Sequence, residues 1–184
     1  MTRALVALAL VVVAACGSSS QSAATASNVA AFQSGDPVKF EVLQGFLPAD
    51  EFLTREGLQK SDMTGMALTV PIRGSQASLT LRKGDVEVVV DIIDTVFNQS
   101  LYAPVAAFLA EGFSTKDDRG YKKAVTFQNQ PAFEEFTSAE RTGGLTILVG
   151  KRYLVHLQGT GIASTDIVRA VASQINLTKL ADLK

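Results

Sequence analysis

The chain has 184 residues, of which 17 are basic and 18 acidic, and its formal net charge is −1 with the histidine neutral. This balance excludes the strongly positive surface with which proteins attract nucleic acids or anionic membranes. Cysteine occurs once, at Cys16, which excludes a framework of disulfide bonds, so a folded domain must be stabilised by its own hydrophobic core.

The start of the chain has the pattern of a secretory signal. A short positive segment with Arg3 is followed by an unbroken apolar run over residues 4–13, and Ala14 and Ala15 then supply the small residues of a cleavage site. The run is shorter than the ~20 apolar residues that a membrane-spanning helix needs. We therefore expect residues 1–15 to be removed as a signal peptide.

The stretch Val13-Ala14-Ala15-Cys16 resembles the lipobox of bacterial lipoproteins. The resemblance implies cleavage between Ala15 and Cys16, a diacylglycerol on the cysteine sulfur, and an acyl chain such as palmitate on its amino group. Two or three chains give a stable anchor, whereas one chain binds a membrane only marginally. By analogy with enteric lipoproteins, Gly17 in place of aspartate favours the outer membrane. The resemblance thus implies a membrane-anchored envelope protein that faces the periplasm.

Residues 16–35 are mostly small or polar and have nothing to bury, so we expect a flexible linker after the lipidated cysteine. A linker of this length reaches roughly 25 Å. Residues 36–184 are enough for one domain with its own core. The expected organisation is a single domain held near the membrane, which does not bind nucleic acid.

The Asp36-Pro37 pair has the order of a helix N-cap and a first-turn proline, and apolar residues then recur at helical spacing. This pattern predicts a short helix over residues 37–44. Residues 48–65 follow no regular period. Apolar residues alternate over 66–72, which predicts a strand, and Pro71 places this strand at a sheet edge because proline cannot donate to a ladder.

Residues 76–95 predict a β-hairpin. If Lys83-Gly84 is a two-residue loop, three apolar pairs lie opposite one another on one face, namely Leu81 with Val86, Leu79 with Val88 and Ala77 with Val90. The second strand is also apolar on its other face, at Val89 and Ile93, which is typical of a central strand that is partly covered on both sides.

A helix of about ten residues is predicted before Gly112 by an apolar stripe at Leu101, Val105, Phe108 and Leu109. A charged turn over residues 115–120 follows. Beyond it, residues 122–128 and 133–138 each predict a further strand.

In the last hairpin two rules conflict. The apolar faces of residues 145–149 and 153–157 align only across a three-residue loop, Gly150-Lys151-Arg152, whereas turn chemistry alone favours two residues. We give the buried pattern precedence, because a one-residue slip would turn a whole apolar face outward. Ser164 can then cap a final helix, whose apolar stripe comprises Ile167, Val168, Val171 and Ile175.

Together these elements predict an α+β domain, in which an antiparallel sheet of about six to seven strands carries two main helices. Their order, with several strands, a helix, four strands and a terminal helix, is similar to that of the PsbP/Mog1-like domains. This resemblance concerns element order alone and carries no function with it.

Catalysis by a nucleophile would need a serine or cysteine beside a base, but the only histidine is His156 and Cys16 would carry lipid. In the predicted register His156 lies across from Thr146 on the less apolar face, which favours a solvated or partly covered strand histidine. No second histidine and no cysteine pair has the spacing of a metal site. The sequence therefore predicts no catalytic residue, no metal and no cofactor.

Carboxylate pairs are the remaining candidates for acid–base chemistry. Glu134 and Glu135 should point to opposite faces of a strand, because adjacent strand residues alternate. Asp117-Asp118 lies in the charged turn, which favours a solvated loop. Asp91, three residues before Asp94, should be half-buried against a basic or hydroxyl partner rather than catalytic.

The missing catalytic set and the lipobox favour a non-catalytic interaction or scaffold module for another envelope component. A second hypothesis is a carrier that holds a small apolar ligand between sheet and helices. Its candidate contacts are Phe97, Phe108, Phe113, Phe127, Phe133 and Phe136. A third hypothesis, a hydrolase that uses carboxylates alone, requires Asp91 or Glu134 in a cleft that faces a second acid or a lysine.

Overall fold

The computed structural model describes four stretches of the chain, which are residues 35–68, 73–98, 105–110 and 112–183. The expected signal peptide, with Ala15, and the expected lipid site at Cys16 lie outside the described residues, as does the expected linker except for Gly35. None of the described helices combines the length and the apolar character that crossing a membrane requires.

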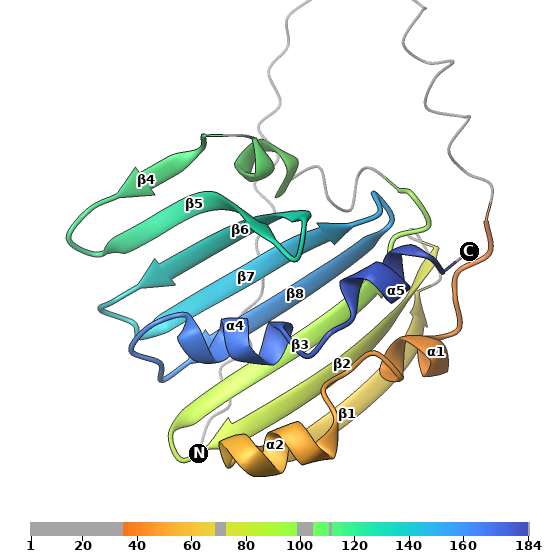
Figure 1. Ribbon diagram of the computed structural model, residues 1–184, viewed down its shortest axis with the longest axis horizontal. Coiled ribbons are helices and arrows are strands. Elements are labelled where there is room, and N and C mark those ends of the chain that lie inside the picture. The colour runs from red at the N-terminus through yellow and green to blue at the C-terminus, as the bar shows by residue number, and fades with distance from the viewer. Residues whose placement is uncertain (1–34, 69–72, 99–104, 111, 184) are drawn as a thin grey trace, which may run out of the picture. The chain divides into compact units, whose positions relative to one another are not determined.

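A single antiparallel sheet dominates the described part of the chain (Figure 1). Its eight strands lie in the order β1-β2-β3-β8-β7-β6-β5-β4, so the chain passes from β3 in the middle of the sheet to β4 at its far edge. The strands are β1 Gln59–Leu68, β2 Gly74–Lys83, β3 Val86–Asp94, β4 Ser114–Lys116, β5 Gly120–Phe127, β6 Gln130–Thr137, β7 Thr142–Val149 and β8 Tyr153–Thr160.

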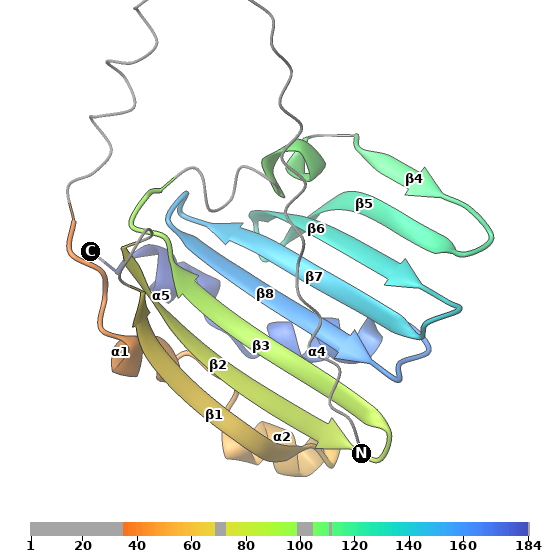
Figure 2. The ribbon, with the colours of Figure 1, turned by 180° about the vertical axis from the view of Figure 1, so that it is seen from behind.

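Short α-helices cover one face of this sheet, and those described are α1 Phe40–Gln44, α2 Asp50–Glu56, α4 Asp166–Ala172 and α5 Leu177–Ala181. The opposite face, seen in Figure 2, carries none of these helices, and we call it the helix-free face. The 3₁₀-helix η2, Ala107–Leu109, contacts β5 and β6. Its Phe108 ring lies 4.9 Å from the ring of Phe133, centroid to centroid.

The prediction of an α+β domain with two main helices and six to seven strands is wrong. The described residues form a β-rich fold with eight strands and only small helices. The predicted helix before Gly112 lies partly outside the described residues, and its described part contains the 3₁₀-helix η2. The predicted final helix is interrupted, because the side chain of Asn176 accepts a hydrogen bond from the backbone N–H of Lys179 at 2.9 Å and starts α5 separately.

Residues 48–65, which follow no regular period, contain α2 and most of β1. Helix α2 buries only Phe52 and Leu53, which is too few for a recognisable apolar stripe. Strand β1 is exposed along nearly its whole length, so its sequence does not alternate over the missed part. Its predicted place at a sheet edge is confirmed, although it begins at Gln59 and the predicted residues 69–72 lie outside the described chain.

The predicted apolar faces of both hairpins are confirmed. In the first, Leu81 pairs with Val88, so the loop is Gly84-Asp85 and the register differs from the predicted one by two residues. A shift of two leaves every side chain on the same face, which is why the alternating pattern could not detect it. In the last hairpin Val149 pairs with Tyr153 across the predicted three-residue loop.

The core lies between the sheet and the helices. One row of cross-strand neighbours, Leu79, Val90, Leu157 and Leu145, has no exposed surface, and it is covered by helix residues such as Val168 and Leu177. Each fully buried side chain of this size contributes roughly 1.5–3 kcal/mol to folding. The sheet therefore depends on its helix layer for stability even though the helices are short.

The predicted helix over residues 37–44 is not formed at its start, where hydrogen bonds attach the chain to the sheet instead. Helix α1 begins only at Phe40, and Asp36 forms an ion pair with Arg73 instead of capping a helix. The backbone carbonyl of Asp36 accepts a hydrogen bond from Arg152 at 3.1 Å. The N–H of Val38 donates to Asp94 at 2.8 Å.

Asp94 and Arg152 form a buried, bidentate ion pair at this point. Arg152 donates through Nε to Oδ1 of Asp94 at 2.8 Å and through Nη2 to Oδ2 at 2.7 Å. Asp94 is fully buried and Arg152 almost so. The hydrogen bonds that Arg152 donates to Asp94 raise the pKa of Arg152, an effect that burial of the guanidinium opposes. The first residues of the domain are thus tied to the ends of β3 and β8.

Candidate functional site

Beyond Leu145, the buried row across the sheet changes from apolar to charged residues. Leu145 of β7 lies opposite Glu134 of β6, and Glu134 lies opposite Lys123 of β5. Only 2% of Glu134 is exposed, although it is a carboxylate on the helix-covered face. A buried charge of this kind requires partners, and these partners define the site.

Four side chains surround Glu134, and we call the five residues the Glu134 cluster. Lys123 Nζ lies 3.1 Å from Oε1, and Arg169 of α4 pairs with Oε2. The hydroxyl of Tyr121 donates to Oε1 at 2.7 Å, and Thr165 donates to the same oxygen at 3.4 Å. Helix α4 and strands β5 and β6 therefore meet at one carboxylate.

The protonation state of Glu134 follows from these contacts. Burial by itself would raise its pKa, but the hydrogen bonds from Tyr121, Lys123 and Arg169 together hold the pKa below its ordinary value. A general acid near neutral pH needs a pKa shifted in the opposite direction. Glu134 does face a lysine, as the hydrolase hypothesis requires, but its contacts favour a permanently charged carboxylate.

The cluster fixes the orientation of Tyr121. Its hydroxyl lies between Glu134 and Thr165, whose Oγ1 is 3.0 Å away, and burial is the main cause of its raised pKa. Its ring centroid lies 6.2 Å from that of Phe136 on the neighbouring strand. Tyr121 and Phe136 thus form a fixed aromatic wall.

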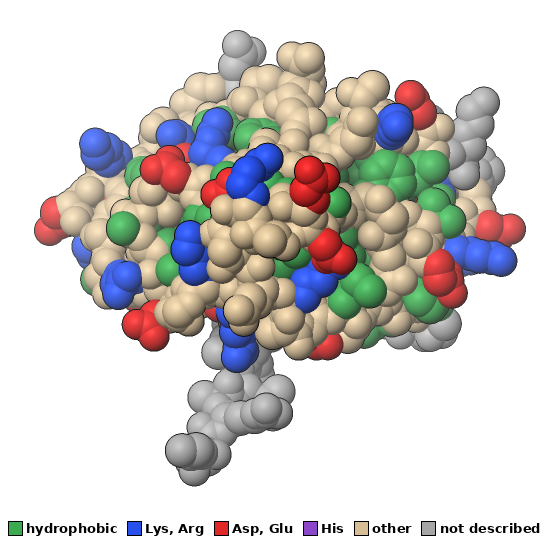
Figure 3. Space-filling view, turned by 60° about the horizontal axis from the view of Figure 1, so that its bottom comes forward, with side chains coloured by type: hydrophobic (Ala, Val, Ile, Leu, Met, Phe, Trp, Pro, Cys, Tyr) green, Lys and Arg blue, Asp and Glu red, His purple; other side chains and the backbone are tan. Residues whose placement is uncertain are grey.

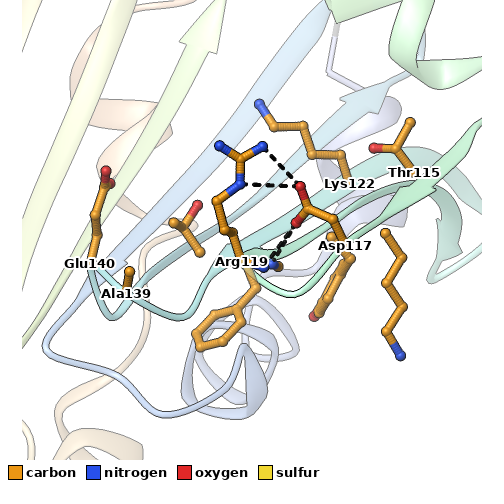
Figure 4. Close-up of a pocket in the computed structure, with 11 residues that line it drawn as sticks. Thr115, Asp117, Arg119, Lys122, Ala139 and Glu140 are labelled. Carbon is orange, nitrogen blue, oxygen red and sulfur yellow. Dashed lines mark hydrogen bonds and ion pairs between the residues drawn. The ribbon is translucent and has the colours of Figure 1, made fainter.

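An open pocket of about 410 Å³ lies at the ends of β4, β5 and β6, and Tyr121 and Phe136 are among its lining residues (Figure 4). We call it the turn pocket, because its other walls are the turn between β4 and β5 and the turn after β6. Its lining comprises Thr115, Lys116, Asp117, Arg119, Gly120, Tyr121, Lys122, Phe136, Thr137, Ala139 and Glu140. The volume lies within the range of about 300–1,000 Å³ that is typical of ligand sites.

The charged lining of the turn pocket is positive on balance, with three basic residues against two acidic ones. Arg119 donates to Asp117 Oδ2 through Nη2 at 3.0 Å, and Lys122 lies 3.1 Å from Glu135. The bond from Arg119 is the main cause of the lowered pKa of Asp117. Lys116 has no hydrogen-bond or ion-pair partner among the described residues, which leaves one cation available to a ligand.

Gly120 shapes the floor of the pocket. A Cβ atom at this position would lie only 1.9 Å from the backbone oxygen of Phe136. No side chain is tolerated there without moving β5 away from β6, so glycine permits the close approach that brings the two turns together.

The helix-free face holds the other predicted candidates in a polar row across four strands. Ser78 pairs with Asp91, Asp91 with His156, and His156 with Thr146. Of the two kinds of partner predicted for Asp91, basic or hydroxyl, the structure has the hydroxyl, since Ser78 donates to it, and Gln76 donates to the same oxygen at 2.9 Å. Nδ1 of His156 lies 2.9 Å from the Thr146 hydroxyl.

Burial lowers the pKa of His156, and the negative charges of Asp91 and Glu135 oppose this shift. The histidine is partly covered, which is one of the two situations predicted for it. Asp94 faces the helix-covered side and lies apart from Asp91. The two do not form an acid pair.

The other carboxylates lie as the sequence indicates. Glu134 and Glu135 point to opposite faces, with Glu135 paired to Lys122. Asp117 and Asp118 are exposed in the turn. Within the described stretches no three His, Cys, Asp or Glu side chains gather closely enough to hold a metal ion.

The six phenylalanines of the carrier hypothesis do not come together. Phe108, Phe113 and Phe133 form one cluster on the helix-free face. On the helix-covered face, Phe127 lies beneath Arg169 and Phe136 beside Tyr121. Phe97 instead contacts Arg152.

Sequence reasoning missed the turn pocket. The charged turn is visible in the sequence, but the aromatic wall is not, because Tyr121 and Phe136 are neighbours only through the β5–β6 register. Arg169 comes from a helix beyond two further strands. The hairpin of β5 and β6 turns at Gln128-Asn129, and both residues have positive φ. A two-residue turn placed there in the sequence would have set Tyr121 opposite Phe136.

On the face seen in Figure 3, basic and acidic side chains are interspersed, with no large patch of either sign. Comparison with protein-family models found no match for this chain, and a search of curated proteins also found none.

Proposed function

We propose that this chain is a lipid-anchored protein of the bacterial cell envelope, whose β-rich domain binds another envelope component without catalysing a reaction. The lipobox ending at Cys16 supports the anchor, with the outer membrane favoured and the domain facing the periplasm. The linker would let the domain reach roughly 25 Å from the membrane.

The observation that carries the binding role is the turn pocket. It has the volume of a ligand site, and its lining includes the aromatic residues Tyr121 and Phe136. It also includes Lys116, which has no ion-pair partner in the part of the chain that the structure describes. Arg119 adds a planar guanidinium, which suits carboxylate and phosphate groups. The pocket therefore binds an anionic group, carboxylate or phosphate, that the envelope component presents.

The non-catalytic part of the proposal rests on how the candidate groups are used. Glu134 is held charged by two cations and a phenol. Asp91 accepts two side-chain hydrogen bonds, and His156 is bonded to Thr146. Each of these three candidate groups thus has a structural partner.

The anchor is tested by growing cells with radiolabelled palmitate. The wild-type chain should incorporate the label, and Cys16→Ala should not. Gly17→Ala keeps the cysteine and is the matched control, so it should label like the wild type. Equal labelling of Cys16→Ala and wild type would remove the lipid anchor from the proposal.

Anion binding is tested with the purified full-length mature protein and two probes, inorganic phosphate and acetate, by following the NMR signals of Tyr121. These signals should shift and saturate with at least one probe, and the more effective probe identifies the kind of anion. Arg119→Gln should weaken binding about fivefold, since an exposed ion pair is worth up to ~1 kcal/mol. Lys179→Gln, exposed on α5, is the control. Unchanged affinity in Arg119→Gln would remove the turn pocket as the site.

A further inference from the structure

The two edges of the sheet differ in what they offer to another strand. Strand β4 has only three residues and ends at Lys116. Strand β1 has ten residues, and almost all of them are exposed. As an edge strand, β1 has one row of backbone N–H and C=O groups with no partner strand in the described sheet. Such a row is a template for an added strand.

Proteins commonly protect an edge with charges, bulges or proline. The first half of β1 has such protection, since its register shifts between Lys60 and Asp62 and Lys60 pairs with Asp50 at 2.6 Å. The second half, from Met63 to Leu68, has no charged residue. This half is therefore open to pairing.

The exposed apolar side chains lie at this same edge. Among the described residues, the large hydrophobic side chains with substantial exposure are Val42, Met63 and Met66, at 43%, 51% and 49%. Two of them belong to β1, and Val42 belongs to α1, which packs on β1 and β2. Met63 pairs with Leu79 and so faces the helix side, whereas Met66 pairs with Gln76 on the helix-free face. An added strand would cover both faces of the edge.

The side chains of this half-strand are complementary in size to those of a second copy that runs antiparallel to it. A two-fold axis normal to the sheet at Gly65 sets Met63 opposite Ala67 of the second copy and Met66 opposite Thr64 of the second copy. Each large side chain then meets a small one on the same face, and Asp62 meets an apolar Leu68 rather than a like charge. The pairing is isologous, as in every dimer with two-fold symmetry, and such dimers are the commonest homo-oligomers.

We infer that β1 pairs antiparallel with β1 of a second copy, so that the two sheets join into one continuous sheet across a two-fold axis. The paired region runs from Asp62 to Leu68 in each copy. A short edge pairing buries less surface than a standard interface, so the dimer should exchange with monomer as concentration changes. This inference does not depend on the lipid anchor or on the turn pocket.

Sedimentation equilibrium of the purified full-length mature protein in density-matched detergent tests the dimer. The wild type should show a concentration-dependent monomer–dimer equilibrium. Met66→Lys should raise the dimer dissociation constant about tenfold or more, because it places a charge on the open edge. Thr115→Lys, exposed on the opposite edge strand β4, is the matched control and should leave the constant unchanged.

A spin label at Ala67→Cys in a Cys16→Ala background gives a second measurement, since the new cysteine is then the only thiol of the chain. The predicted register places the two Ala67 Cα atoms roughly 15 Å apart, from ~3.4 Å per residue along the strand and ~4.8 Å between strands. A wild type that stays monomeric, a dimer that Met66→Lys does not weaken, or labels far beyond this separation would each overturn the inference. Circular dichroism melts of both lysine variants should match the wild type.

Discussion

Two buried carboxylates, Asp94 and Glu134, show how differently one domain can use the same chemistry. Asp94 has an arginine partner that is itself buried, and it also accepts hydrogen bonds from the backbone N–H groups of Val38 and Val96. Glu134 is equally buried, but the side chains of its cations Lys123 and Arg169 remain 41% and 39% exposed.

Asp94 therefore has a structural role, whereas Glu134 also has a positioning role. Asp94 and its partner Arg152 bind the first residues of the domain through Val38 and the carbonyl of Asp36, and none of these residues lines the turn pocket. Glu134 instead orients Tyr121, which is one of the residues that line the turn pocket. Loss of Asp94 or Arg152 should therefore act on stability, whereas loss of Glu134 should act on stability and on binding.

The largest expected effect comes from Arg152→Met. This change leaves the carboxylate of Asp94 buried without its cation, and removal of one partner of a buried pair costs about 3–5 kcal/mol. The free energy of unfolding from urea denaturation should fall by that amount. A loss below ~1 kcal/mol would contradict a structural role for the pair.

The double variant Arg152→Met with Asp94→Leu separates the charge from the packing. Removing both charges often restores stability, because no uncompensated ion remains. The double variant should therefore unfold at a higher urea concentration than Arg152→Met alone. Equal instability of the two variants would show that the loss comes from the packing of Arg152 on Phe97 and Tyr153 rather than from the charge.

Glu134→Gln should have a smaller effect on stability and a separate effect on binding. Loss of the charge weakens three hydrogen bonds, but water can still solvate the half-exposed cations, so we expect a loss of about 1–3 kcal/mol. Tyr121 should lose its fixed orientation, so the affinity of the turn pocket for its anion should also fall. Glu135→Gln, on the opposite face and paired only with Lys122, is the matched control.

The pH dependence of the free energy of unfolding tests whether Glu134 is held charged in the folded state. Because the folded state holds the pKa of Glu134 below its ordinary 4.5, the unfolded chain binds the proton first as pH falls. The stabilisation is complete above about pH 4.5 and is lost as the pH falls below it. Urea denaturation at pH 3–6 should show this loss in the wild type and a shallower loss in Glu134→Gln. Parallel curves for the wild type and Glu134→Gln would contradict a lowered pKa of Glu134.

The sequence predicts which side chains share a face, but not how far strands are offset or where the charges gather. Alternation places Asp91 on the less apolar face with a hydroxyl partner, and it selects the correct three-residue loop before Tyr153. It cannot resolve a two-residue shift in the first hairpin. Glu134 is surrounded by residues from three elements, so its burial follows from tertiary packing that no local period contains.

The missed elements have the same cause. Helix α2 and strand β1 bury so little that neither leaves a clear apolar period in the sequence. The predicted final helix does show a period, but the capping side chain of Asn176 divides it. The apolar pattern therefore predicts which side chains share a face of the sheet. It does not predict where the short helices and the exposed strand begin and end, because capping and exposure determine those positions.

The smallest expected effect belongs to an ion pair whose arginine is mostly exposed. Arg82 and Glu87 face each other across β2 and β3 at 2.7 Å, but the side chain of Arg82 is 61% exposed. Arg82→Gln should therefore lower the free energy of unfolding by less than ~1 kcal/mol, and added salt should remove most of that difference. The distance between charges is the same as in the Asp94–Arg152 pair. A loss near that of Arg152→Met would show that geometry, and not desolvation, sets the cost of breaking a charge pair in this sheet.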